Sequence, residues 1–190
     1  PSIMKKNAIL LNVNSPFVKN NDVKEIYGLI DSAGYTLSAK ITQDMGKPDP
    51  AFFLGAGKAS QIQRALFEFF QAHVKAELSK VLIEEYEETY EKLDLGLPDS
   101  VNHPSQIIAI FNNDLKTTQK VELNRIWAIK VIDRNDLILE IFENHARTRQ
   151  SKLQIELARH KLRADIVKSD YGRAVQEKQG RDFMGKGVMG

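Results

Sequence analysis

The chain has 190 residues and a net charge of +2; 42% of its residues are hydrophobic, 27% are charged and none is cysteine. This composition excludes a mainly disordered chain, a disulfide framework and a zinc site made of thiolates. No apolar stretch approaches the roughly 20 residues that cross a bilayer, and no signal-peptide pattern opens the chain, so we expect a cytoplasmic protein without a membrane span.

The N-terminal part of the chain predicts a strand–helix–strand unit. Residues 8–13 (AILLNV) are almost continuously apolar, as in a strand buried on both faces of a parallel sheet. Apolar residues then recur at helical spacing over 23–33, where Asp22 is a suitable N-cap and Gly34 a suitable residue just past the end. Residues 37–41 alternate between apolar and polar side chains, which predicts a second, half-exposed strand.

The next segment predicts a turn and a helix. Two prolines in residues 45–50 (MGKPDP) allow only an irregular turn, and residues 52–54 are expected to form a brief third strand. The sequence Gly55-Ala56-Gly57-Lys58 then opens a helix. The apolar face of that helix consists of Ile62, Ala65, Leu66, Phe69 and Phe70.

Residues 75–104 contain eight acidic residues and three lysines, and we interpret them as an acidic insertion. Their apolar residues predict an amphipathic helical extension that ends at Gly96 and Pro98; a strand at residues 81–83 is the alternative. Phosphates would repel such an acidic segment, so we expect it to lie away from any RNA surface.

The rest of the body predicts two further strand–helix pairs. Residues 107–111 (IIAIF) are the clearest buried strand, followed by a turn at 112–118 and a helix through 121–126. Residues 127–132 lead into the last strand, and a helix begins at Asp136. This alternation predicts an α/β fold over residues 1–146, with a doubly wound, mainly parallel sheet of four or five strands. Aspartates in its turns would by default cap helices; they are Asp44, Asp49, Asp114, Asp133 and Asp136.

Residues 147–190 predict a long basic helix and a glycine-rich linker. Ser151 and Gln154 match a capping box, with Thr148 as the alternative cap. A helix on a single core needs one apolar face, but this one has two, so we expect the second to be covered by a later part of the protein, a partner or a second copy. One stripe consists of Leu153, Leu157, His160, Ala164, Val167 and Tyr171, and the opposite one of Ile155, Ala158, Leu162 and Ile166.

The basic residues are concentrated at the C-terminal end. Residues 1–143 carry 16 Lys or Arg against 20 Asp or Glu, whereas residues 144–190 carry 11 against 5. A basic end on a neutral-to-acidic body is typical of a protein that meets a polyanion, and the lack of bulky apolar anchors there favours nucleic acid over membrane. A solvated charged helix is the alternative. The expected RNA-binding residues are Arg147, Arg149, Lys152, Arg159, Lys161, Arg163, Lys168, Arg173, Lys178, Arg181 and Lys186.

Several short segments, in order and at suitable spacing, carry a resemblance to a known family. They are AGY at 33–35, KPDP at 47–50, FFLGAGK at 52–58, VIDRNDLILEIF at 131–142, ARTR at 146–149 and KLQIELAR at 152–159. In these segments the chain resembles the N-terminal domain of HflX-type GTPases, which act on the ribosome. It departs from bacterial members at residues 112–118, where they usually have a Ser-Pro-containing turn, and at Gln150-Ser151, which replaces Glu-Gly. The hairpin segment after Leu162 also diverges, which favours an archaeal-like branch.

The resemblance implies an α/β subdomain, a helical hairpin whose tip enters the peptidyl-transferase region of the large ribosomal subunit, and a G domain. Residues 168–187 would then lie nearest rRNA, and GTP and Mg²⁺ would belong to the G domain, which is absent from this chain. The sequence has no G-x-x-x-x-G-K-[ST] loop, so we expect no GTP hydrolysis and expect the chain to end in the linker before the G domain. No catalytic set is predicted, and His73, His103, His145 and His160 show no metal spacing.

Two alternatives stay open. Gly55, Gly57 and Lys58 could bind a nucleotide phosphate through free amides at the start of the following helix, and members of the family are thought to bind a second nucleotide in this domain. A tight turn into a helix explains the glycines equally well. The other alternative is a scaffold that dimerises through the second stripe of the long helix.

Overall fold

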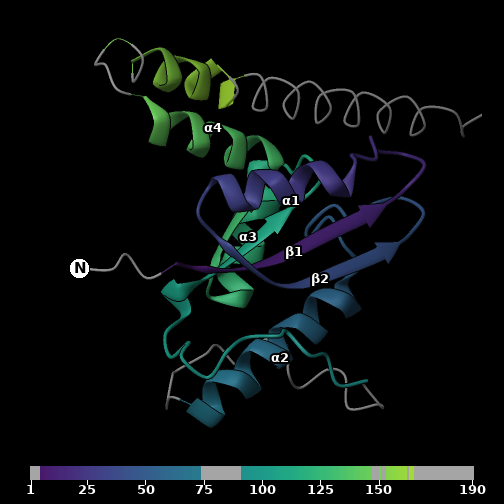
Figure 1. Cartoon of the computed structure of the whole chain (residues 1–190). Helices are drawn as coiled ribbons and strands as arrows, with labels where there is room; N and C mark the ends of the chain where they lie inside the picture. The colour runs from purple at the N-terminus through teal and green to yellow at the C-terminus, as the bar shows by residue number, and fades with distance from the viewer. Residues whose placement is uncertain (1–4, 74–90, 147–149, 151–152, 162, 165–190) are drawn as a thin grey trace, which may run out of the picture. The chain divides into compact units, whose positions relative to one another are not determined.

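The computed structural model describes residues 5–73, 91–146, 150, 153–161 and 163–164 (Figure 1). The chain divides into two units, Pro1–Asn144 and His145–Gly190. None of the helices in the described ranges is long and apolar enough to cross a membrane.

The first unit is built on a parallel sheet. In the part of the chain that the structure describes, this sheet has four strands: β1 (Asn7–Asn14), β2 (Thr36–Asp44), β3 (Ile107–Phe111) and β4 (Lys130–Asp133). Their order is β2-β1-β3-β4, and every neighbouring pair is parallel. The predicted mainly parallel α/β sheet is therefore confirmed.

Helices cover both faces of the sheet, because β1 and β3 present large apolar side chains to each. Ile9 and Leu11 lie in a core with α2 (Ala56–His73) and α3 (Thr117–Trp127). Ala8 and Leu10 lie in a second core with α1 (Val23–Ser32) and α4 (Arg134–His145). Figure 1 shows α1 and α2 on opposite sides of β1 and β2. This is the predicted doubly wound arrangement. A single 3₁₀ turn, Pro104–Gln106, precedes β3.

Local signals explain the limits of α1. Asp22 accepts the Lys24 backbone N–H at 2.9 Å as the N-cap, and Gly34 follows the helix with a φ of +81°. That left-handed conformation suits glycine, and it turns the chain directly into β2. The predicted cap and stop residues are both confirmed.

The predicted strand at residues 52–54 is wrong. This segment is a turn closed by an isolated antiparallel bridge between Asp49 and Phe53. The Asp49 carboxylate accepts the N–H groups of Ala51 (2.7 Å) and Phe52 (2.8 Å), and Phe53 has a φ of +67°. These local bonds compete with extended backbone, although Phe53 and Leu54 still reach the core.

The helical extension predicted in the acidic segment is wrong for residues 91–98, which have no helical structure. Asp94 accepts the N–H of Gly96 at 2.8 Å, and Gly96 turns with a φ of +58°. Leu95 and Val101 are buried in the core, so this part of the segment belongs to the body of the fold. The rest of the prediction, including the alternative strand at 81–83, falls on residues outside the described ranges.

In the second unit, residues 150, 153–161 and 163–164 are helical, as predicted. Leu153 and Leu157 of the first apolar stripe are each 55% exposed, whereas Ile155 of the second stripe is half-buried. Ser151 and residues 165–190, which include the ends of both predicted stripes, lie outside the described residues.

Candidate functional site

The carboxyl ends of β1 and β3 are the position at which this fold would hold a ligand. In open α/β sheets, ligands bind outside the carboxyl ends of the strands, where the strand order reverses. Here the order reverses between β1 and β3, since β1 has β2 on its other side and β3 has β4. Polar side chains gather at this point.

Asparagines form most of this polar cluster. Asn112 follows β3 and donates to the Asn12 side chain (2.9 Å) and to the Asn21 carbonyl (3.0 Å). Asn21 donates back to the Asn112 carbonyl at 2.7 Å. Asn113 accepts the Val13 N–H and donates to the Val13 carbonyl, both at 2.9 Å. These bonds fix the loop after β3 to β1 and to the loop that precedes α1.

Arg134 completes the cluster from the start of α4. Its Nη1 donates to Asn112 Oδ1 at 3.1 Å, and its Nη2 lies 2.6 Å from Glu25 Oε2. The Arg134 side chain is only 10% exposed, whereas that of Glu25 is 63% exposed. Because an exposed ion pair contributes little, the buried bond to Asn112 is the contact that holds the guanidinium in place.

A second charged cluster joins α3, β4 and α4. Lys120 Nζ lies 2.7 Å from an Asp136 oxygen and 3.5 Å from an Asp133 oxygen. Burial and the neighbouring Asp136 charge raise the pKa of Asp133 to about 6. Burial works against ionisation of Asp136 too, but its contacts with Lys120 outweigh burial and hold its pKa below the usual value. The predicted capping role is confirmed for Asp133, which accepts the Asp136 and Leu115 N–H groups. Asp136 lies inside α4 and accepts the Asp133 N–H at 3.2 Å.

These clusters are structural. Within the described residues, every buried side-chain nitrogen or oxygen has a hydrogen-bond partner. No three His, Cys, Asp or Glu residues in those same ranges are arranged to hold a metal ion. A network in which each buried side-chain nitrogen or oxygen has a partner holds the loops in place.

The Gly55 loop lies at the start of α2, next to the end of β2. The Gly55 N–H donates to Gln43 Oε1 at 2.8 Å, and Lys58 Nζ donates to Gln61 Oε1 at 2.8 Å. A phosphate at this helix start would have to displace both glutamines. Gly57 faces open space, since a Cβ there would meet nothing within 4 Å. Nucleotide binding at Gly55, Gly57 and Lys58 stays a prediction.

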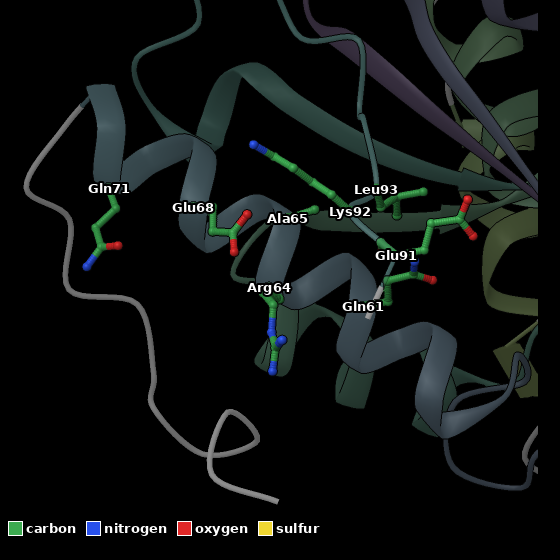
Figure 2. Close-up of a pocket in the computed structure, with 8 residues that line it drawn as sticks. All are labelled: Gln61, Arg64, Ala65, Glu68, Gln71, Glu91, Lys92 and Leu93. Carbon is green, nitrogen blue, oxygen red and sulfur yellow. Dashed lines mark hydrogen bonds between the residues drawn. The ribbon is translucent and has the colours of Figure 1, made fainter. Parts of the chain in front are cut away.

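A groove of about 590 Å³ runs between α2 and residues 91–93. Figure 2 shows Gln61 beside Glu91 and the Lys92 side chain extending along the helix. Gln61 Nε2 donates to the Glu91 carbonyl at 2.8 Å. The groove is lined by two basic residues, Arg64 and Lys92, and two acidic residues, Glu68 and Glu91. Their charges cancel, so the groove does not attract a phosphate electrostatically.

Three of the eleven predicted RNA-binding residues fall in the part of the chain that the structure describes: Arg159, Lys161 and Arg163. All three are on the helix of the second unit, where Lys161 and Arg163 are exposed and Arg159 is half-buried. Arg159 and Arg163 are four residues apart and so share one side of the helix. The other eight, Arg147, Arg149, Lys152, Lys168, Arg173, Lys178, Arg181 and Lys186, lie outside the described residues.

Sequence reasoning missed the asparagine cluster and Arg134. A signal was present, because Asn112 and Asn113 directly follow the most apolar strand, and Arg134 directly follows β4. In parallel sheets such positions meet at one edge.

Comparisons with known proteins place the chain in a family of GTPase N-terminal domains. The family model described as GTP-binding GTPase N-terminal matches residues 20–91 and 96–143. The GTPase HflX of Thermofilum pendens is 30% identical over 163 residues, which cover 86% of this chain and 30% of that protein. The GTPase HflX of Escherichia coli is 30% identical over 166 residues, covering 87% of this chain and 31% of its own length. The chain thus spans less than a third of the length of these relatives.

Solved structures agree on the fold. A GTP-binding protein from the hyperthermophilic archaeon Sulfolobus solfataricus, solved in complex with GDP, has a TM-score of 0.52 and 21% identity. The match covers 95% of this chain and 44% of that one. At this identity the likeness concerns the fold alone.

Proposed function

Since the chain belongs to the family of GTP-binding GTPase N-terminal domains found in HflX proteins, we propose that it docks on rRNA of the large ribosomal subunit and couples that docking to a G domain outside this chain. GTP and Mg²⁺ would be bound by the G domain. The proposal implies a cytoplasmic protein.

One observation carries this proposal: the chain divides into two units of opposite charge. The α/β unit has its buried polar groups satisfied within the described residues, which makes it a rigid support. The second unit contains the basic surplus, with 11 Lys or Arg against 5 Asp or Glu over residues 144–190. Lysines and arginines that contact phosphates release counterions, so binding by such a unit should weaken steeply as salt increases.

The test is co-sedimentation of the chain with purified large subunits over a range of salt concentrations. We expect Arg159→Glu combined with Arg163→Glu to weaken pelleting and to flatten its salt dependence. Lys5→Glu combined with Lys40→Glu is the matched control, because it changes net charge equally at exposed positions of the α/β unit. Equal pelleting of the wild type and the arginine variant would count against the proposal.

Nucleotide binding by Gly55, Gly57 and Lys58 is a second proposal. It is supported by the exposed start of an 18-residue helix, where Gly57 leaves open space for a phosphate. Dimerisation through the long helix is a third proposal. The exposure of Leu153 and Leu157 supports the first stripe, and not the second, as the contact surface, and a molecular mass that increases with concentration would reveal it.

A further inference from the structure

Phe17 is the most exposed large hydrophobic side chain in the described residues. It is 70% exposed, on the loop that joins β1 to α1 at the carboxyl edge of the sheet. No ring contact involves it within the described ranges. An exposed phenyl ring contributes no free energy of burial to the fold, so stability does not explain why this loop presents it to solvent.

The Phe17 loop is pinned on both sides. The Phe17 N–H donates to Ser15 Oγ at 3.1 Å, and Ser15 Oγ donates to the Gly46 carbonyl on the neighbouring loop. The Ser15 N–H donates to Asn20 Oδ1 at 3.3 Å. The next residue, Val18, packs against the core. The backbone that carries the ring is therefore fixed before any partner binds, which lowers the entropy that binding would cost.

Two lysines accompany the ring. Lys19 lies on the same loop, and Lys47 follows Gly46, to which Ser15 is bonded. Both are exposed, and neither forms an ion pair with another residue that the structure describes. Residues 15–21 and 45–48 contain these two lysines and no acidic residue. The neighbouring carboxylates are already engaged: Asp22 caps α1, Asp44 accepts Asn14, and Asp49 closes its own turn.

We propose that Phe17 is a stacking platform for an unpaired base of RNA, with Lys19 and Lys47 as phosphate contacts. Binding of single-stranded nucleic acid combines these two components, an aromatic ring that stacks with a base and cations that follow the backbone. The inference rests on the proposed RNA-binding function, but it assigns a separate surface, on the α/β unit.

The surroundings of Phe17 favour RNA over a protein or a membrane as the partner. A protein hot spot is an aromatic residue within a larger packed interface, and a membrane anchor needs several apolar side chains. Phe17 is instead flanked by the exposed residues Pro16, Lys19 and Asn20, and by Gly46 and Lys47 on the next loop. A single ring among cations and polar groups matches a base and its phosphate.

The experiment is a fluorescence titration of the full chain carrying Phe17→Trp with a short unpaired oligoribonucleotide. The one native tryptophan, Trp127, is buried at 1% exposure, so a change in emission reports on position 17. We expect quenching by unpaired RNA and little by the same RNA annealed to its complement. In a parallel anisotropy assay, Phe17→Ala should weaken binding about fivefold or more, as expected for the loss of one stacked base. Lys19→Ala with Lys47→Ala should make the slope of log K against log salt shallower by about 1.4.

Phe142→Ala is the matched control, because Phe142 on α4 is also exposed, at 58%. The inference would be overturned if Phe17→Ala bound unpaired RNA as tightly as the wild type, or if it lost no more affinity than Phe142→Ala. Equal quenching by single-stranded and duplex RNA would also overturn it. The Arg159→Glu and Arg163→Glu variant separates the two proposals. If it no longer pellets with large subunits while Phe17→Ala binds RNA normally, only the stacking platform is refuted. If it pellets like the wild type while Phe17→Ala binds RNA more weakly, only the docking of the basic helix is refuted.

Discussion

Arg134 and Asn112 are joined by a buried hydrogen bond, 3.1 Å from Nη1 to Oδ1, that links the start of α4 to the end of β3. Asn112 is fully buried, and it donates in turn to Asn12 and Asn21. One guanidinium thus holds in place the side chain that fastens the two central strands. The chain leaves the α/β unit through α4, so this contact also anchors the element that precedes the basic unit.

Replacement of Arg134 should therefore destabilise the fold. In Arg134→Met, Asn112 Oδ1 would remain buried but would lose the guanidinium that donates a hydrogen bond to it. We therefore expect the free energy of unfolding to fall by about 1–3 kcal/mol. Urea unfolding measures this change. Glu25→Gln removes only the exposed partner and should cost no more than about 1 kcal/mol. Equal losses in the two variants would contradict the importance of the buried bond.

Asp133 should make stability depend on pH. Burial, together with the Asp136 charge, raises the pKa of Asp133 from 3.8 to about 6, so the folded chain binds a proton there more readily than the unfolded chain. This carboxyl contributes stability that is fully present below about pH 3.8 and is lost as the pH rises through about 6. Relative to Asp133→Asn, the wild type should lose unfolding free energy between these values. The unfolding free energy of Asp31→Asn, a change at an exposed site, should vary with pH as that of the wild type does. If the unfolding free energy of Asp133→Asn varied with pH in parallel with that of the wild type, the raised pKa of Asp133 would be refuted.

Gly96 should tolerate no side chain. A Cβ there would lie 2.3 Å from the Ser38 carbonyl oxygen, on backbone with a φ of +58°. Backbone cannot move aside as a flexible side chain can, and the left-handed conformation adds its own cost, so Gly96→Ala should lower the free energy of unfolding by about 2 kcal/mol or more.

Gly28→Ala is the matched control for Gly96→Ala. Gly28 lies inside α1, where an added Cβ meets nothing within 4 Å. Alanine favours helix, so this variant should gain about 0.5–1 kcal/mol. Thermal unfolding of both variants checks the pair, and a Gly96→Ala protein as stable as the wild type would show that Gly96 does not lie against the Ser38 carbonyl of β2.

Lys58 tests the nucleotide proposal. Its amine donates to Gln61 at 2.8 Å, and a bound phosphate would have to replace that acceptor. If the loop binds nucleotide, titration of labelled ATP should show weaker binding to Lys58→Ala than to the wild type. Lys24→Ala, at an exposed position of α1, is the charge control. Equal affinities for the wild type and Lys58→Ala would remove the lysine from the site.

Short-range patterns predicted most of the fold. The continuous apolar runs at residues 8–13 and 107–111 became the two central strands, because only a strand covered on both faces has no polar side. The predicted limits of α1 at Asp22 and Gly34 were correct because a cap and a left-handed stop act within one turn of helix. The prediction failed at residues 52–54 and 91–98, where aspartate side chains bond to the backbone of neighbouring residues and replace regular structure.

The sequence by itself determined the parallel α/β sheet, its covering helices and the separation of the basic surplus from the body, since periodicity and charge are properties of neighbouring residues. Only the tertiary structure decided that Asn12, Asn21, Asn112 and Arg134 form one closed network, and that Phe17 stands exposed beside Lys19 and Lys47. Both results depend on contacts between segments far apart in the chain. Such contacts arise when packing of the sheet brings loop ends together, and no local pattern encodes which side chain then finds a partner and which stays in water.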